Sequence, residues 1–387
     1  MPEGGINFST EPPLEAYQRT RARRRFYQIV DRFEAADCSS STSSSSSSSS
    51  NRYNRPRLVR LTFEHALSEE SKDNVLRAFF RFMPSPMDED KDIDFTNEDL
   101  EKEVYSSLIG FAEYLLNNFF LPLKASSRKT PQPSPVYHSA VQEAQGAQEF
   151  AGTPTRLSTL RGSCLVRDRH RCVITRRFDL AEAERRIGRS GSSAQDDDGE
   201  LLANETRDWE KLEVAHILPH SLTKVGLDSQ SERSKQAALM ILNMFDNGVA
   251  HLIEGIDIDR PRNAITLTPT LHWQFGSFRN FFTPSADHQP HTYRIDSHLP
   301  VLLRGPLPVT RSLYLTETRT IDPPSPRLLA VHRAISYILH LSAAGEYIDK
   351  ILEDIEEQGI RADGSTELGR LVSLRLYGWL DGTVDAY

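Results

Sequence analysis

Cysteine is scarce in this sequence of 387 residues, and the few that occur exclude several kinds of protein. Cys38, Cys164 and Cys172 are too few for a disulfide framework, and their odd number suits a reducing compartment. No Cys-x-x-Cys pair occurs, so we expect neither a zinc ribbon nor a zinc knuckle.

Long apolar runs are also missing. The longest, such as residues 119–123 and 301–303, fall far short of the roughly 20 residues that cross a bilayer. The first residues carry no basic segment followed by an apolar one, which is the pattern of a secretion signal. We therefore expect an intracellular protein, in the nucleus or the cytoplasm, without a membrane partner.

Charge is distributed unevenly along the chain. The net charge of −8 argues against a protein that coats nucleic acid through its bulk charge. Residues 155–190 nevertheless hold ten arginines and only four acidic residues, and a second basic group lies at residues 19–25. Acidic residues concentrate at 88–103 and 196–200. A local basic patch favours phosphate contact, and an arginine-rich solvated surface is the competing interpretation.

Composition divides the chain into five regions. We expect a basic segment with a serine-rich linker at 1–53, a helical region at 54–125, a second linker at 126–155, the motif-bearing domain at 156–313 and a helical region at 325–387. The fold class expected is α+β, with helical regions before and after the central domain.

Apolar residues at helical spacing predict helices in both flanking regions. The helix over residues 98–121 has Asn97 as its N-cap and is expected to end before Pro122. Further predicted helices span residues 14–33, 71–82, 231–244, 328–355 and 368–380.

Three short segments of the central domain carry residues with useful chemistry. Residues 213–219, Glu-Val-Ala-His-Ile-Leu-Pro, have the pattern of a strand with His216 near its end. Residues 262–268 alternate as a strand does and begin close to Asn263. Pro269 can open a helix capped by Thr268, which places His272 in the first turn.

The order strand, loop, strand and helix, with these three residues, resembles the ββα-metal module of HNH endonucleases. The phrases Ala-His-Ile-Leu-Pro and Asn-Ala-Ile-x-Leu-x-x-x-x-His-x-x-Phe are similar to the HNH variety common in fungal proteins. The resemblance covers about residues 163–282. It implies a central ββα-metal fold and a metal-dependent endonuclease that hydrolyses nucleic-acid phosphodiester bonds, with DNA as the favoured partner.

The resemblance also implies a role for each residue. His216 takes the position of the general base, and a neutral imidazole can accept a proton from water at physiological pH. His272 takes the position of a ligand to one divalent ion, for which magnesium or manganese is favoured and zinc is an alternative. Asn263 would hold the loop or orient His216. Taken singly, each of these residues is more often structural.

Two positions depart from the family pattern. Ala215 stands directly before the base, where many relatives carry an acidic or histidine ligand. A carboxylate ligand is therefore expected from elsewhere, and the candidates by proximity in sequence are Glu213, Asp257 and Asp259. His220 is a further candidate ligand.

A further stretch that resembles the family contains Cys172. Many relatives place a second cysteine three residues later and bind a structural zinc, but this chain has Thr175 there. We therefore expect no structural zinc and interpret Cys172 as a small buried residue.

Arg167, Arg169 and Arg171 alternate just before that cysteine, so one face of a strand could present them to nucleic acid. The competing interpretation is that their stems line the edge of the core. Asn247 is an alternative to Asn263 as the middle residue, although Gly248 after it indicates an ordinary turn.

An alternative function belongs to a different class. Ala215, the acidic net charge and the large helical flanks are also compatible with a catalytically inactive HNH fold that binds nucleic acid or protein. A protein partner would then contact the helical flanks.

Overall fold

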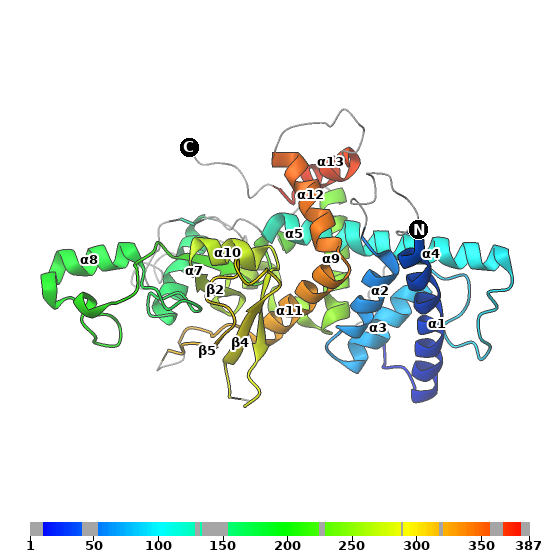
Figure 1. The fold of residues 1–387 in the computed structure, drawn as a ribbon, viewed down its shortest axis with the longest axis horizontal. Helices are drawn as coiled ribbons and strands as arrows, with labels where there is room; N and C mark the ends of the chain where they lie inside the picture. Colours follow the sequence, from blue (N-terminus) through cyan, green and yellow to red (C-terminus); the bar gives the residue numbers. More distant parts are fainter. Residues whose placement is uncertain are drawn as a thin grey trace. The chain divides into compact units, whose positions relative to one another are not determined.

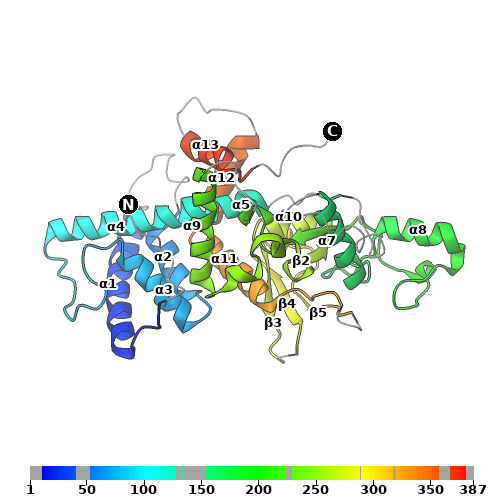
Figure 2. The same ribbon diagram turned by 180° about the vertical axis from the view of Figure 1, so that it is seen from behind.

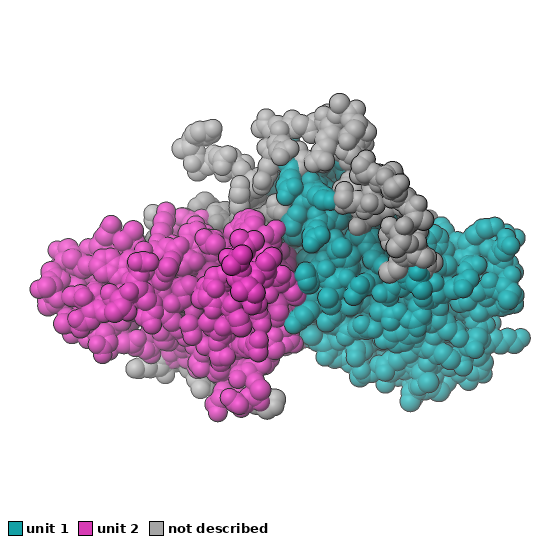
Figure 3. Space-filling model, in the orientation of Figure 1, with its two compact units in different colours: residues 1–125, 226–251, 334–380 teal, residues 126–225, 252–333, 381–387 magenta. Residues whose placement is uncertain are grey.

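The computed structural model of the chain combines helices with small sheets, as expected of an α+β protein. It describes residues 11–40, 53–127, 132–133, 154–223, 229–287, 289–316, 320–356 and 367–380. The chain divides into two compact units, coloured separately in Figure 3. Unit 1 comprises residues 1–125, 226–251 and 334–380, and unit 2 comprises residues 126–225, 252–333 and 381–387.

Unit 1 is helical in its described part, and Figure 1 shows α1 to α4 side by side. Its helices are α1 (Ala16–Ser40), α2 (Arg55–Glu64), α3 (Glu69–Phe80), α4 (Glu98–Leu115), α9 (Ser229–Phe245), α12 (Ala344–Glu356) and α13 (Leu368–Leu376). Phe26, Phe63, Phe79 and Phe111 fill the space between the first four helices, and the rings of Phe26 and Phe63 lie 4.8 Å apart. Phe111 belongs to the apolar stripe that the sequence spacing predicted over residues 98–121, and Phe79 lies in the helix predicted over residues 71–82.

The helix predicted over residues 98–121 is only partly as expected. The Asn97 side chain accepts hydrogen bonds from the Asp99 and Leu100 amides, which confirms the predicted cap. The predicted end at Pro122 is wrong, because a π-helical turn, η2 (Leu116–Phe120), leads into α5 (Leu121–Ser127). The wider turn places Pro122 in the first turn of α5, where the missing amide hydrogen is tolerated.

The single long helix predicted over residues 328–355 is also wrong. The chain forms α11 (Pro326–Leu341), which has residues in both units, and then α12. Ala343 lies between them with φ of 61°, and no α-helix continues through such a left-handed residue. The Ser342 hydroxyl accepts a hydrogen bond from the Ala344 amide and so caps the new helix.

In its described residues, unit 2 contains two small antiparallel sheets and three helices that lie wholly within it. The strands are β1 (Glu213–His216), β2 (Ala264–Leu267), β3 (Asn280–Pro284), β4 (Thr292–Ser297) and β5 (Val309–Ser312). The helices are α7 (Pro154–Arg167), α8 (Leu180–Ser190) and α10 (Pro269–Gly276). Short 3₁₀ turns are η3 (Gly191–Ser193), η4 (Leu202–Asn204), η5 (His220–Leu222), η6 (Val249–Leu252), η7 (Gly255–Asp259) and η8 (Pro261–Asn263), of which η6 begins in unit 1.

Strands β1 and β2 form the two-stranded sheet at the centre of the motif, and α10 follows β2 directly. The pairing places His216 opposite Ala264 and Glu213 opposite Leu267. Helix α7 packs on the side of Val214 and Ala264, and α10 packs against β1. Figures 1 and 2 show α7 and α10 beside β2. The predicted strands and helix are confirmed, and Thr268 is the N-cap residue, although its side chain makes no capping bond.

Strands β3, β4 and β5 form the second sheet in that order, which the sequence patterns did not predict. Strand β3 ends in proline, and β5 has only four residues. The alternation of apolar and polar residues in these strands is therefore too short to predict them. Among the described residues, no helix is long and apolar enough to cross a membrane.

Candidate functional site

His216 ends β1 and is buried, with 6% of its surface exposed. Its Nε2 atom lies 3.1 Å from Oδ1 of Asp259, at the end of η7. An ionised carboxylate only accepts hydrogen bonds, so in the neutral ring Nε2 carries the hydrogen and Nδ1 keeps its lone pair. Nδ1 is buried and has no hydrogen-bond partner in the described structure. This ring is therefore prepared to accept a proton at Nδ1.

His272 forms a second carboxylate–histidine pair, in which the carboxylate contacts Nδ1 instead of Nε2. Its Nδ1 atom lies 2.8 Å from Oε2 of Glu213, and the hydrogen bond from His272 lowers the pKa of that carboxyl below its ordinary value. The lone pair is then on Nε2, which is buried without a hydrogen-bond partner in the described structure. Metal-ligating histidines are commonly oriented in this way by a carboxylate on the other nitrogen.

Asn263 is fully buried and uses its amide to hold the backbone on two sides of the site. Its Nδ2 donates to the carbonyl oxygens of Leu218 and Ile258, both at 2.9 Å, and its Oδ1 accepts from the Leu218 amide at 3.0 Å. Leu218 lies two residues after His216, and Ile258 lies directly before Asp259. Asn263 thus positions both members of the first pair through their backbone. These three bonds go to the backbone of Leu218 and Ile258 and not to the His216 ring.

The two pairs lie on opposite faces of β1. Glu213 and His216 are three positions apart on the strand, so their side chains alternate, with a separation along the strand of roughly 10 Å. Within the described ranges, no group of three or more histidine, cysteine or acidic residues is arranged to hold a metal ion.

The other predicted metal ligands have partners of their own. Asp257 receives hydrogen bonds from Arg260 at 2.5 Å and Arg262 at 3.1 Å. Asp259 also lies 3.7 Å from Nε of Arg156, and the ring of His220 lies 5.7 Å from that of His216. The donor that fits a divalent ion is therefore Nε2 of His272, a buried lone pair with no partner in the described structure.

Arg167 is wholly engaged in the fold of unit 2. The expectation that it shares a strand face with Arg169 and Arg171 is wrong, because α7 extends to Arg167 and Arg169 has φ of 55°. Its guanidinium binds both oxygens of Asp168 and three backbone carbonyls, and these bonds use all five of its donors. In this conformation Arg167 has no donor for a phosphate.

Residues 169–171 pair, in antiparallel order, with three consecutive aspartates. The pairs are Arg169 with Asp198, His170 with Asp197, and Arg171 with Asp196. Arg171 is buried and also binds Glu205 at 2.6 Å, so the acidic segment neutralises this basic stretch. The charge surplus counted along the sequence is cancelled here by folding.

Cys172, next in the chain, is fully buried, as predicted. Its Sγ atom accepts a hydrogen bond from the amide of Thr175 at 3.4 Å. The turn that joins these two residues is thus held by the thiol itself.

The basic residues of α1 are neutralised in the same way within unit 1. Each binds a carboxylate: Arg19 with Asp73, Arg21 with Asp90, Arg23 with Glu69, Arg24 with Asp92 and Arg25 with Glu89. The acidic residues that the sequence concentrates after position 88 supply three of these partners. The interpretation of this group as a phosphate-binding patch is therefore not favoured.

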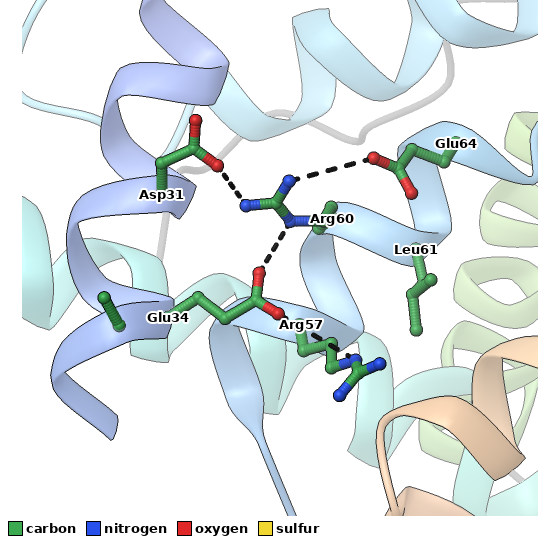
Figure 4. Close-up of a pocket in the computed structure, with 7 residues that line it drawn as sticks. Asp31, Glu34, Arg57, Arg60, Leu61 and Glu64 are labelled. Atoms are coloured by element: carbon green, nitrogen blue, oxygen red, sulfur yellow. Dashed lines mark hydrogen bonds and ion pairs between the residues drawn. The ribbon is translucent and has the colours of Figure 1, made fainter. Parts of the chain in front are cut away.

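A pocket of unit 1 shows the same pairing (Figure 4). Arg60 binds Glu34 at 2.6 Å, binds Asp31, and lies 4.0 Å from Glu64, while Arg57 lies 3.9 Å from Glu34. Ala35 and Leu61 complete the lining. The charges of this pocket are satisfied among themselves.

Comparison with known families places the motif residues in one domain. Residues 172–283 match the model of the HNH endonuclease family, which confirms the resemblance. The match includes His216, Asn263 and His272, and it starts after Arg171. No curated protein and no solved structure matches the chain.

Replacing Asn263 should strongly destabilise unit 2. Asn263→Ala leaves the Leu218 amide and two buried carbonyls without their partners, so we expect the free energy of unfolding to fall by about 3–5 kcal/mol. Asn263→Asp should cost a similar amount, because a carboxylate cannot donate to the two carbonyls. Urea unfolding, followed by circular dichroism, measures the free energy of unfolding of both variants. Asn204→Ala, at an exposed position, is the neutral control. A loss below about 1 kcal/mol in Asn263→Ala would contradict the stabilising role assigned to these three hydrogen bonds.

Asp197 should make stability depend on acid. Burial raises its pKa, but hydrogen bonds from His170 and Arg186 outweigh this and lower the pKa to about 2 from 3.8. A depressed folded pKa stabilises the fold above the unfolded value, and this contribution disappears as the pH falls from about 4 to 2. Since the carboxylate is 30% exposed, we expect Asp197→Asn to cost about 1–2 kcal/mol at pH 7.

Urea unfolding of the Asp197→Asn variant and the natural protein at pH 7, 4 and 3 tests this expectation. The difference between them should be largest at pH 7 and should shrink below pH 4. Asp208→Asn removes an aspartate that is 88% exposed and serves as the matched control. A difference that stays constant or grows in acid would contradict the assigned direction.

Proposed function

We propose that the domain at residues 172–283 is a metal-dependent endonuclease that hydrolyses phosphodiester bonds of nucleic acid, with DNA as the favoured substrate. The observation that carries this proposal is the buried His216–Asp259 pair, which leaves the lone pair of Nδ1 without a partner in the described structure. The family match is an independent argument for a nuclease.

In this proposal His216 is the general base. Nδ1 takes a proton from a water molecule while the water oxygen forms a bond to phosphorus, and the bond from phosphorus to the leaving oxygen breaks. The ring becomes positively charged, and the Asp259 carboxylate bound to Nε2 stabilises that charge. Solvent returns a proton to the leaving oxygen. Asn263 keeps base and carboxylate in register by holding the backbone beside each of them.

His272 is the residue that would hold the divalent ion, through Nε2. When bound, such an ion neutralises negative charge on the phosphate oxygens. The role of Glu213 is to bind Nδ1, which fixes the ring and directs Nε2 away from the carboxylate. Because the described residues hold no group of three or more metal ligands, water and substrate oxygens would complete the coordination, and weak binding is expected.

Plasmid nicking in magnesium or manganese tests the proposal. We expect cleavage by the natural protein and a loss of about 10²–10⁴-fold in His216→Ala, which is the contribution of a general base. Asp259→Asn keeps the size of the side chain but removes the negative charge that stabilises the protonated ring, so its rate should also fall at least about tenfold.

His291→Ala, in the connection between β3 and β4, is the control variant and should cut at the natural rate. Circular dichroism checks that each variant is folded. Equal cutting by the natural protein and by folded His216→Ala would show that the activity does not come from this site.

A binding module without catalysis is the second candidate function. It is favoured by Ala215 and by the lack of a group of three or more metal-binding residues in the described structure. Titration calorimetry with manganese separates the two candidates. We expect measurable binding that weakens at least about tenfold in His272→Ala. If manganese binds neither protein while DNA still binds, the chain is a binding module.

A further inference from the structure

Arg176, Arg311 and Tyr314 form a group in unit 2 that has no part in the site described above. The guanidinium carbon of Arg176 lies 4.2 Å from the centre of the Tyr314 ring. Arg311 donates from Nε to the carbonyl oxygen of Ile174 at 2.7 Å, directly before Thr175 in the same turn as Arg176. We call these three residues the arginine–tyrosine cluster.

Arg176 and Arg311 are satisfied differently from Arg171, which lies in the same region. In the described structure, the hydrogen bonds of Arg176 and Arg311 go to backbone carbonyls, those of Ser312, Ile174 and Thr310. By contrast, Arg171 binds two carboxylates. Burial and the nearby charge of Arg311 both lower the pKa of Arg176, as expected for two cations close together.

Arg176 also has features of a residue held in place at some cost. Its backbone is left-handed, with φ of 64°, which a non-glycine residue adopts only where its surroundings enforce it. Its Nη1 atom is buried and has no hydrogen-bond acceptor in the described structure. A buried donor without a partner costs free energy, and an incoming acceptor would remove that cost.

The cluster is connected to the strand pair that carries the candidate site. The Val173 amide donates to the Thr266 carbonyl of β2 at 2.9 Å, and the Arg176 amide donates to the Cys172 carbonyl at 3.0 Å. The turn over residues 172–176 therefore continues from β2 on the edge that is not paired with β1. Asn263 and His272 flank the same strand.

We propose that Arg176 and Arg311, with Tyr314 packed against Arg176, bind a backbone phosphate of the nucleic-acid substrate. A guanidinium offers two parallel donors that match phosphate oxygens, and one dianionic or monoanionic group would relieve the repulsion between two adjacent cations. Tyr314 restricts Arg176 through its ring face, which lowers the entropy lost on binding. This inference rests on the proposed function, since it names where the substrate backbone is held.

DNA binding without cleavage tests the inference. We would measure the anisotropy of a labelled 20-base-pair duplex in EDTA, at several salt concentrations, for Arg176→Gln, Arg311→Gln and the double variant. Each single change should weaken binding about 5–50-fold, and each should reduce the slope of log affinity against log salt by about one. The double variant Arg189→Gln with Arg294→Gln removes the same charge from other positions and should weaken binding less than about threefold.

Conservative variants and a small competitor complete the experiment. Arg176→Lys and Arg311→Lys keep the charge, so they should recover part of the affinity and show that lost binding does not reflect unfolding, which circular dichroism also checks. Inorganic phosphate at millimolar concentration should compete only weakly with the duplex. If the double variant at Arg176 and Arg311 binds DNA as tightly as the control double variant, the inference is wrong. If inorganic phosphate binds tightly at these arginines while DNA affinity is unchanged, the site serves a small phosphate and the inference is also wrong.

The outcomes separate this inference from the proposed function. His216→Ala should keep full affinity for the duplex, because His216 is not in the arginine–tyrosine cluster. Loss of DNA binding in Arg176→Gln and Arg311→Gln, together with a natural protein that never cuts, would support the phosphate site and reject the nuclease. Cutting that depends on His216 but is insensitive to both arginines at low DNA concentration would support the nuclease and reject the phosphate site.

Discussion

The side chain of Asn263 is the constraint on which the candidate site depends. A single buried amide makes three hydrogen bonds to the backbone at Leu218 and Ile258, and those segments carry the histidine and the carboxylate of the first pair. Neither segment belongs to a long regular element, since β1 ends at His216 and η7 is one short 3₁₀ helix. Without the amide, the Leu218 amide and the Leu218 and Ile258 carbonyls would lose these buried bonds. The role proposed for Asn263 is therefore to position other groups rather than to react.

The two carboxylate–histidine pairs follow from one strand of four residues. Alternation sends Glu213 and Ala215 to the face of His272, while Val214 and His216 face the other way. A ligand at position 215 would therefore share the face of the helix histidine, which explains why relatives place one there. In this chain the same face presents Glu213, two residues earlier, and its carboxylate binds the far nitrogen of the ring. Ala215 cannot supply a metal ligand, but the contact of Glu213 with Nδ1 still leaves Nε2 of His272 suited to coordination.

The sequence was sufficient for the parts of the fold in which local signals agree with one another. Proline after a threonine cap, alternating residues after asparagine and an apolar stripe behind Asn97 each identify an element and nearly its limits. It was insufficient where a local rule yields to its neighbours. Pro122 is accommodated by a π-turn, and Ala343 breaks a periodic helix without any glycine or proline to signal it. Asp259 could be named as a useful carboxylate, but its partnership with His216 depends on a loop that returns after more than forty residues.

The arginines show why charge along a sequence and charge on a surface differ. Residues 169–171 are the most conspicuous basic run beside the motif, yet three aspartates in reversed order neutralise them. Arg176 and Arg311 donate to backbone carbonyls in the described structure; they are far apart in sequence, and neither belongs to a motif. Folding brings them together because a turn that extends β2 meets the end of the second sheet, which no periodicity predicted. A chain with a net negative charge attracts a polyanion through such local groups, because its overall field is repulsive. Because carboxylates pair with the basic runs at residues 19–25 and 169–171, those runs offer less attraction to a phosphate than the proposed site at Arg176 and Arg311 does.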